Sequence, residues 1–253
     1  MHRTPDTWLA ALDERHFANL TQSEVTRALR ALSSCYVERR EKLTTGGALD
    51  GAGKRAAFAL FYGPQHFFIA REVSRHLWPD SPPPFERIVD LGCGTGTAGA
   101  AIALACQATV EGYDLNPWAV NEANWTYAAL GVRGRASVAN IRSVRIKAVA
   151  KTLILAAYSV NELPPEIRSQ LLQQLISATE ACASVLVMEP IGRRVNLWWP
   201  EWVNALTARG CREDEWRFRV QLPPRQRALA KGSGLSVQEL TAKSLYVGGG
   251  KPT

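Results

Sequence analysis

Ile88-Val-Asp-Leu-Gly-Cys-Gly-Thr-Gly96 is the stretch of sequence that decides the fold. Its apolar start, Val89–Leu91, is typical of a buried parallel strand. Three glycines then alternate with other residues, and a turn without side chains lets the backbone approach a ligand closely. The small, apolar segment Thr97–Gln107 predicts a helix that leaves this turn with its first N–H groups directed at the ligand. The order of strand, glycine turn and helix predicts a nucleotide-cofactor pocket.

The strand expected next, Thr109–Tyr113, is followed by Asp114. A carboxylate at this point is placed to accept hydrogen bonds from both hydroxyls of a ribose. Leu115 and Trp118 come next and could flank an adenine, since apolar and aromatic faces stack on purines. Trp118 could equally pack on the sheet as an ordinary helix residue.

Two cofactors compete for this pattern. Gly94-x-Gly96-x-x-Gly99 is formally a dinucleotide fingerprint, which alone is weak evidence for NAD. Asp90 favours S-adenosylmethionine (SAM), because a carboxylate there would repel a pyrophosphate but suits the ammonium group of a methionine. Asp90 could instead only cap the turn. The order Asp-x-Gly-x-Gly-x-Gly resembles motif I of class I SAM-dependent methyltransferases, so we expect SAM. The alternatives are NAD and a glycine turn without a ligand.

Beyond residue 85, strand and helix patterns alternate, which predicts a parallel sheet wrapped by helices. The expected strands are Arg87–Leu91, Thr109–Tyr113, Ala136–Ala139, Thr152–Ala157, Ser184–Glu189, Glu215–Leu222 and Ser244–Val247. The expected helices are Thr97–Gln107, Pro117–Leu130, Pro165–Cys182 and Pro200–Arg209. Five strands that alternate with helices, and two further strands, fit the α/β, Rossmann-like, seven-stranded class I methyltransferase sheet, whose last strand usually inserts antiparallel.

Residues 1 to about 80 have helical patterns. Thr21-x-x-Glu24 is a capping box that opens one helix, and Lys54–Leu77 predicts another, interrupted by Gly63-Pro64. Glycines between the two are expected to break the chain: Gly46, Gly47, Gly51 and Gly53. Because Ser81-Pro-Pro-Pro84 is a stiff linker, we place a domain boundary there. The N-terminal helical region, 1–84, would act as a lid or bind substrate, and 85–253 would bind SAM.

The composition is that of an ordinary globular protein, with 46% apolar residues among 253. No apolar run reaches the roughly 20 residues of a membrane span, and acidic residues interrupt any signal or transit peptide near the N-terminus. We therefore expect a cytoplasmic protein. The five cysteines are scattered, without a Cys-x-x-Cys pair or a neighbouring set of histidines. This spacing argues against structural zinc, an iron–sulfur cluster or disulfides, so we expect no metal.

The net charge of +7 and the pI of about 9.4 favour a polyanionic partner, RNA above all. Two basic stretches could grip RNA, since cations neutralise phosphates and aromatic rings stack on unpaired bases. One is Lys54-Arg55 with Phe58, Phe61 and Tyr62, which could equally be an amphipathic helix with core rings. The other, 223–231, is expected to be a loop before the last strand and could be merely solvated.

Further site residues should follow the third and fourth strands, because ligands of an open α/β sheet bind beyond the carboxyl ends of its strands. Asn140 can accept from the adenine amino group and also donate, or it can be a turn residue. Asn161 and Glu162 lie in a segment that should face the methyl group, and either could orient an acceptor. A buried Glu162 with a raised pKa could serve as base, or it could only cap the next helix.

The site residues expected from the sequence therefore form two sets. Cys93 is included because it lies in the glycine turn, where its thiol could be reactive or simply small enough to fit. The expected catalytic residues are Asn161 and Glu162. The expected cofactor-binding residues are Asp90, Gly92, Cys93, Gly94, Gly96, Asp114, Leu115, Asn140, Ile141 and Tyr158.

Several segments occur in one order along the chain. They are Lys54-Arg-Ala-Ala-Phe-Ala59, Tyr62-Gly-Pro64, Val89–Gly96, Ala157-Tyr-Ser-Val-Asn-Glu-Leu-Pro164 and Glu189-Pro190. In this order the chain resembles the methyltransferase-like family of the small ribosomal subunit, which is found in bacteria and mitochondria and linked to ribosome assembly. The resemblance spans roughly residues 54–190, and the Tyr158–Pro164 block is its most particular part. The chain departs from the family in lacking the cysteine cluster of many members.

The resemblance implies methyl transfer from SAM to an RNA base, with rRNA of the small ribosomal subunit as the expected substrate. A small-molecule methyltransferase is the first alternative. In that case the N-terminal helices would close over a pocket lined by Tyr62, Trp198 and Trp199. The second alternative is a SAM-binding assembly factor of the ribosome without activity, in which the cofactor only stabilises the fold.

Overall fold

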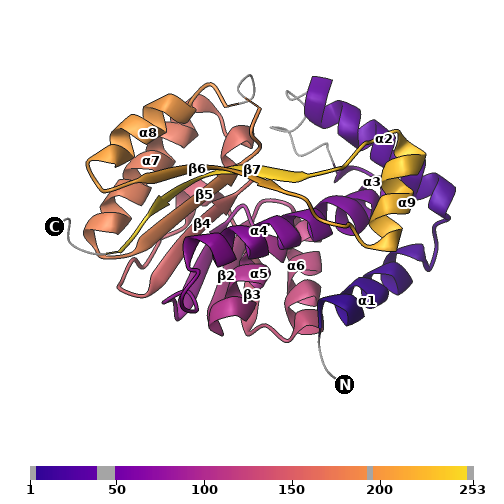
Figure 1. Ribbon diagram of the computed structural model, residues 1–253, viewed down its shortest axis with the longest axis horizontal. Coiled ribbons are helices and arrows are strands. Elements are labelled where there is room, and N and C mark those ends of the chain that lie inside the picture. The colour runs from indigo at the N-terminus through magenta and orange to yellow at the C-terminus, as the bar shows by residue number, and fades with distance from the viewer. Residues whose placement is uncertain (1–3, 39–48, 193–195, 250–253) are drawn as a thin grey trace.

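The computed structural model describes residues 4–38, 49–192 and 196–249. Within them, seven strands form one mixed sheet in the order β3-β2-β1-β4-β5-β7-β6 (Figure 1). β1 to β5 pair in parallel, and β7 inserts antiparallel between β5 and β6. The expected seven-stranded methyltransferase sheet is confirmed. Its strands are β1 (Arg87–Leu91), β2 (Thr109–Asp114), β3 (Gly134–Val138), β4 (Thr152–Ala157), β5 (Ser184–Glu189), β6 (Arg212–Phe218) and β7 (Leu240–Val247).

Helices cover both faces of the sheet, because successive side chains of each strand point to opposite faces. Ile88 of β1 belongs to the core beneath α4, α5 and α6, whereas Val89 belongs to a second core beneath α7 and α8 (Figure 1). The bounds of these helices are α4 (Gly63–Leu77), α5 (Thr97–Cys106), α6 (Pro117–Leu130), α7 (Pro165–Glu180) and α8 (Trp199–Thr207). The carboxyl ends of the parallel strands are left together at one edge, where ligands of such sheets bind.

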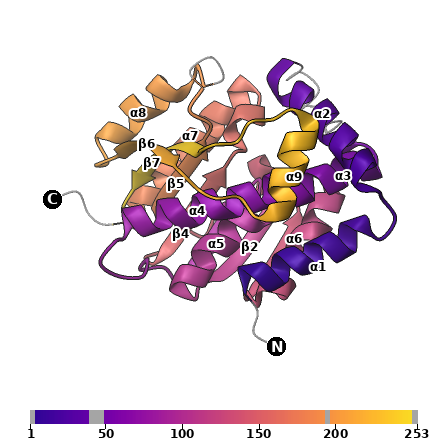
Figure 2. The same ribbon diagram turned by 45° about the vertical axis from the view of Figure 1, so that its right-hand side comes forward.

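The N-terminal helices pack beside the sheet domain. α1 (Pro5–Phe17) lies along α6, and α2 (Gln22–Glu38) lies against α3 (Ala52–Ala57) (Figures 1 and 2). The capping box at the start of α2 is confirmed. The backbone N–H of Thr21 donates to Glu24 Oε2 at 2.7 Å, and the N–H of Glu24 donates to Thr21 Oγ1 at 3.3 Å. The glycine break expected at 46–47 lies outside the described residues.

The expected interruption at Gly63-Pro64 is a π-helical turn, η3 (Phe58–Tyr62), which joins α3 to α4 without a break in the helical path. The N–H of Gly63 donates to the carbonyl of Phe58, five residues earlier. Pro64 has no N–H to donate to the carbonyl four residues earlier. The helix can therefore take up the extra residue of the π turn just before Pro64. Single π turns inside helices often occur at functional sites.

The expectation of a loop at 223–231 is wrong. This segment belongs to α9 (Pro224–Ser233), which packs on α2 (Figure 2). Pro224 stands in the first turn of the helix, where proline is tolerated and its fixed φ is favourable. Gly234 ends the helix at φ +77°. The buried amide of Gln226 donates to the carbonyl of Leu60 at 2.9 Å and ties α9 to η3.

The bounds of three strands also differ from the sequence prediction by two or more residues, and β3 begins at Gly134 where Ala136 was expected. β6 begins at Arg212 and ends at Phe218, and β7 begins at Leu240, four residues earlier than expected. The two strands pair with each other over their full length, so the pairing partner extends them where local patterning is polar. A single core joins residues on both sides of 81–84, for example Phe67 and Ile102. The division at residue 84 into a lid region and a SAM-binding domain stays a prediction.

Candidate active site

The glycine turn after β1 has the conformation that only glycine adopts without strain. Gly92, Gly94 and Gly96 have φ of +72°, +51° and +74°. A Cβ on Gly92 would lie 2.4 Å from Ser159 Cβ, and one on Gly96 would lie 2.7 Å from the ring of Tyr127. The turn is therefore pressed against its neighbours from two sides. Its backbone N–H groups bond inside the protein, since those of Gly92 and Cys93 donate to the carbonyl of Tyr113 and that of Gly96 donates to the carbonyl of Cys93.

Asp114, which ends β2, holds this turn in place. Its Oδ2 accepts from the N–H of Gly94 at 2.9 Å, and its Oδ1 accepts from the N–H of Asn116 at 2.8 Å. Burial raises the pKa of Asp114, and these N–H groups oppose that rise. Each carboxylate oxygen has a further lone pair for a ligand hydroxyl. Leu115 follows it with 63% of its surface exposed, a rare apolar exposure that suits the face of a ring.

Asp90 lies beneath the turn and is 1% exposed. Neither of its carboxylate oxygens has a regular hydrogen-bond partner, and a Cβ on Gly99 would lie 2.5 Å from Oδ2. Burial raises the pKa of Asp90 to about 7, and the negative charge of Asp114 acts in the same direction, whereas the N–H of Gly99 opposes them. A buried carboxyl group without partners is costly unless it is protonated or meets a donor or cation that binds there.

The other expected cofactor residues are divided between the core and the surface. Cys93 is buried in the main core, and burial raises the pKa of its thiol well above the usual value, so the structure gives no reason to expect a reactive thiolate. Ile141 is buried against the turn, with Cδ1 3.6 Å from the Cβ position of Gly92. Asn140 is exposed and accepts from the N–H of Arg142 at 3.0 Å, which leaves its NH₂ group toward solvent.

Aromatic rings stand on the other side of the turn. Tyr158 follows β4 with φ +59°, and its ring stacks on that of His66 at 4.2 Å between centroids and 7° between planes. The hydroxyl of Tyr158 is buried without a partner. Phe58 of η3 lies 3.9 Å from the Cβ position of Gly94 and 6.2 Å from the ring of His66. Phe58 of η3 and His66 of α4 thus lie beside Tyr158 at the end of β4, and we name these three rings the aromatic wall.

The imidazole of His66 was not expected at the site. It is enclosed by rings although part of its surface stays accessible, and burial lowers its pKa to about 4. It is therefore neutral at physiological pH, with one nitrogen able to donate and the other to accept. A signal did exist, because Phe58, Tyr62 and His66 recur every fourth residue and so share one face of a helix.

Asn161, in the turn η5 (Val160–Glu162), is the centre of a polar network with Glu189 and Trp198. Trp198 Nε1 donates to Asn161 Oδ1 at 2.8 Å, and because an indole can only donate, this bond fixes the orientation of the amide. Asn161 Nδ2 and backbone N–H then donate to Glu189 Oε2 and Oε1 at 2.7 and 3.1 Å. Both oxygens of Glu189 are thereby held as acceptors.

Asn196 completes the network. Asn161 Nδ2 also donates to Asn196 Oδ1 at 2.7 Å, and Asn196 Nδ2 donates to the carbonyls of Pro190 and Gly192 at 2.5 and 3.0 Å. The amide hydrogens of Asn161 are therefore both used inside the protein. Its side chain organises the segments after β4 and β5 and has one remaining lone pair, on Oδ1, for anything else.

Glu189 ends β5 and is 1% exposed. Burial raises its pKa to about 8, the nearby charge of Glu162 adds to the rise, and the donors of Asn161 oppose it. Glu162 itself is half-buried and lies close to Glu189. The structure therefore brings together Asn161 and Glu162, the two expected catalytic residues, and adds Glu189, the last residue of β5.

Other residues considered for ligand contacts have partners within the protein. Trp198 and Trp199 are 7% and 3% exposed and pack in the second core, so they do not line an open pocket. Arg55 lies 5.9 Å from the ring of Trp118 and donates to the carbonyl of Leu49, so both belong to packing contacts. Arg225 of α9 pairs with Asp13 at 3.0 Å.

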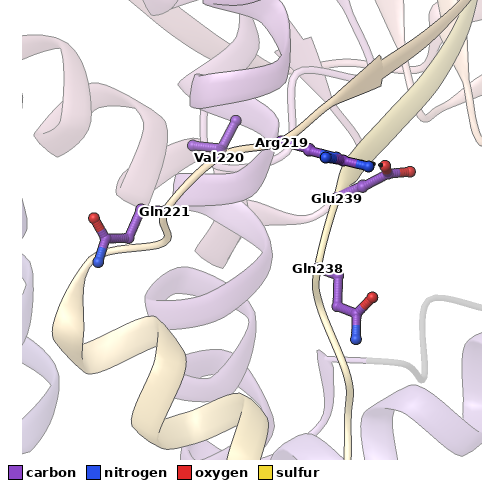
Figure 3. Close-up of a pocket in the computed structure, with 5 residues that line it drawn as sticks. All are labelled: Arg219, Val220, Gln221, Gln238 and Glu239. Atoms are coloured by element: carbon purple, nitrogen blue, oxygen red, sulfur yellow. Dashed lines mark ion pairs between the residues drawn. The ribbon is translucent and has the colours of Figure 1, made fainter.

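A separate hollow lies between the two segments that connect β6 and β7 to α9 (Figure 3). Its lining includes one ion pair, Arg219 with Glu239 at 3.6 Å, and otherwise uncharged side chains. None of its residues contributes to the glycine turn. In the described part of the chain, no three His, Cys, Asp or Glu side chains group closely enough to hold a metal ion. No described helix is both long enough and apolar enough to cross a membrane.

Comparison with known proteins bears on the same region. Residues 88–181 match the model of a family described as "Methyltransferase domain". The comparison with curated proteins gave no match. Among solved structures, the methyltransferase domain of bacterial CtHen1-CN is 11% identical with a TM-score of 0.49, covering 73% of this chain and 97% of that one.

Two further solved structures have similar scores. Geranyl diphosphate C-methyltransferase from Streptomyces coelicolor A3(2) is 12% identical with a TM-score of 0.47, covering 72% of this chain and 77% of that one. A SAM-dependent methyltransferase from Aquifex aeolicus is 13% identical with a TM-score of 0.45, covering 72% and 90%.

The matched residues run from β1 to the end of α7 and contain the glycine turn, Asp114 and the segment after β4. The strand order, with an antiparallel β7, is that expected of the class I methyltransferase sheet. The domain match over residues 88–181, the strand order and the glycine turn agree with one another, and they favour SAM over the NAD alternative. They support a methyltransferase enzyme with SAM as its cofactor.

Proposed function

We propose that this methyltransferase acts on RNA, with rRNA of the small ribosomal subunit as the substrate. The observation that carries the proposal is the aromatic wall at the acceptor side of the turn, where Tyr158 stacks on His66 and Phe58 stands beside Gly94. Such rings suit a planar acceptor, since unpaired bases stack on aromatic side chains. The net charge of +7 supports a polyanionic substrate.

For the cofactor, we propose that Asp114 accepts the ribose hydroxyls while Leu115 covers one face of the adenine. Ile141 would meet the adenine from the other side, and Asn140 would donate its free NH₂ group to a ring nitrogen. The buried carboxyl of Asp90, which has only the N–H of Gly99 beside it as a donor, would bind the methionine ammonium, directly or through water. Gly92, Cys93, Gly94 and Gly96 would contribute backbone alone, and Tyr158 would border the methyl group.

When bound, SAM supplies an electrophilic methyl group on a sulfonium. The protein's own task is then to position a nitrogen, oxygen or carbon nucleophile in line with it, and positioning alone can account for a large part of the rate. We propose that Glu162 accepts the acceptor's proton. Asn161 acts as a positioning residue, because its hydrogen bonds to Glu189 and Trp198 fix the backbone that carries Tyr158 and Glu162.

The test is methyl transfer from labelled SAM to three acceptor pools: naked total RNA, small ribosomal subunits and a metabolite extract. Label in RNA or subunits is expected and would allow the methylated base to be mapped. Label only in metabolites would replace the proposal by a small-molecule methyltransferase.

A second measurement separates catalysis from binding. Glu162→Gln should lower turnover on the labelled acceptor by about 10²-fold or more while SAM affinity, measured by calorimetry, stays within about twofold. Transfer to no pool would contradict an RNA methyltransferase and favour an assembly factor that only binds SAM. The cytoplasmic location expected from the sequence remains a prediction.

A further inference from the structure

The positive charge of this protein is concentrated in one stretch of sequence. Residues 133–151 contain six lysines and arginines and no aspartate or glutamate, in a chain whose net charge is +7. Elsewhere cations and anions nearly balance. The six are Arg133, Arg135, Arg142, Arg145, Lys147 and Lys151. Neither basic stretch singled out from the sequence lies in this segment.

The stretch comprises the edge strand β3 and the crossover to β4. This crossover contains only the short turn η4 (Ile141–Ser143) and then an irregular segment, whereas parallel strands are commonly joined through an α-helix. Burial alternates along it, with Val144 buried, Arg145 exposed, Ile146 half-buried and Lys147 exposed. The apolar side chains pack in the second core, so the basic side chains are directed outward.

The acidic groups on this side are already neutralised inside the protein. Arg87 donates to both oxygens of Glu111 at 2.7 and 2.6 Å, and Lys151 pairs with Glu86 at 2.5 Å. Glu111 lies opposite Arg135 in the β2–β3 pairing, yet no ion pair forms between them. Arg133 donates to the carbonyl of Gln107 at 3.0 Å. Among the described residues, the other four exposed cations of the stretch besides Lys151 have no carboxylate partner. They are Arg135, Arg142, Arg145 and Lys147, and we name them the basic edge.

The paired helices α2 and α9 make a useful contrast. They carry exposed cations too, but Arg225 is bound to Asp13 and Arg30 donates to the carbonyl of Gly232. Arg27, Arg227 and Lys231 remain exposed on these helices without a carboxylate within 4 Å in the described residues. These two arginines and one lysine match, in number and type, the three basic-edge residues Arg135, Arg145 and Lys147, so they can serve as a control.

We propose that the basic edge is the surface on which the phosphate backbone of the RNA substrate docks. Its member nearest the cofactor end of the sheet is Arg142, two residues beyond Asn140, and Arg135 lies in β3, the edge strand beside β2 (Figure 1). Arginine provides a planar fork that matches phosphate oxygens. A strand held on this edge could therefore extend to the aromatic wall at the end of β4. This inference rests on the proposed RNA substrate.

The experiment compares two triple variants of the full chain. Arg135→Gln, Arg145→Gln and Lys147→Gln alter the basic edge, and Arg27→Gln, Arg227→Gln and Lys231→Gln alter α2 and α9 by the same charge. Arg142 is left intact because it adjoins the expected adenine contacts. The dissociation constant of whichever labelled RNA the wild type methylates is measured between about 50 and 200 mM salt. SAM affinity by calorimetry checks that both variants fold.

The basic-edge variant should bind RNA about 10- to 100-fold more weakly, and the slope of log affinity against log salt should fall by about 2. The control variant should stay within about threefold. Equal losses in both variants, or an unchanged slope for the first, would overturn the inference, and the cations of β3 would then only protect an edge strand. Binding to anionic lipid vesicles but not RNA would overturn it too. Failure of the wild type to methylate RNA would instead contradict the proposed function.

Discussion

At the ends of β1 and β2 the site is made of backbone, whereas at the ends of β4 and β5 it is made of side chains. The first region has three glycines at positive φ and a carboxylate that binds the turn's N–H groups. The second has an amide, an indole and a buried carboxyl, linked across residues 161–198. Substitutions on the cofactor side should therefore act by straining the backbone. Changes on the acceptor side should act by altering hydrogen bonds and protonation.

The largest effect is expected at Gly92. Gly92→Ala adds a Cβ at 2.4 Å from Ser159 Cβ, where both atoms belong to packed segments, so the free energy of unfolding should fall by about 3 kcal/mol or more. SAM binding should be lost with it. The matched control is Gly210→Ala, at φ +71° with nothing within 4 Å, which should cost only about 1 kcal/mol. Equal urea midpoints for the two variants would contradict a crowded turn.

The next effect concerns Asp114, the side chain that binds the glycine turn. Asp114→Ala removes the acceptor of the Gly94 and Asn116 N–H groups, so calorimetry should give a SAM dissociation constant about 30- to 100-fold weaker. Asn116→Ala is the control, because its Oδ1 caps α6 through the N–H of Trp118. It should cost about 1 kcal/mol of stability yet change SAM affinity only a few-fold. The reverse ranking would refute the assignment of Asp114.

A third comparison uses pH on the acceptor side. Because the pKa of Glu189 is raised to about 8 in the folded protein, its neutral form is favoured there. The stability this contributes is full below the unfolded pKa near 4.5 and is lost as pH rises through about 8. Relative to Glu189→Gln, which cannot ionise, the wild type should therefore lose on the order of 4 kcal/mol between pH 5 and 9.

The measurement is urea unfolding of both proteins across that pH range. Asp90, whose pKa is about 7, titrates in both and cancels in the difference. Charged or titratable groups near Glu189 are Glu162, Tyr158, Arg168 and Lys243, and they too are common to both proteins. A pH-independent difference would mean that the network keeps Glu189 ionised throughout.

The smallest effect is expected from exposed leucines on the two sides. Leu115 is 63% exposed, so Leu115→Ala should leave stability unchanged but weaken SAM binding about 3- to 10-fold through lost contact with the adenine. Leu197, 83% exposed beside Trp198, provides the control on the acceptor side. Leu197→Ala should leave the SAM dissociation constant within about twofold. If the two variants bind SAM equally, Leu115 does not contact the cofactor.

The same contrast explains what could be predicted from the sequence. The cofactor side is encoded by neighbouring residues, so Ile88–Gly96 indicated its strand, turn and helix together. The network of Asn161, Glu189 and Trp198 depends on contacts between residues up to 37 apart, which no local pattern contains. His66 was missed although its helical spacing with Phe58 and Tyr62 was visible. The helix α9 was missed because two prolines at 223–224 were interpreted as loop residues, when they stand just before it and in its first turn.

The position of α9 has a consequence for synthesis of the chain. α2 buries Val25, Leu29 and Leu32, and part of its covering comes from α9, which lies about 200 residues later in the sequence. A ribosome adds roughly 5–20 residues per second. The apolar face of α2 is therefore made many seconds before α9, which covers part of it. We expect the nascent N-terminal helices to remain open to proteases and chaperones until α9 emerges. A segment made late in synthesis would then complete the packing of one made early.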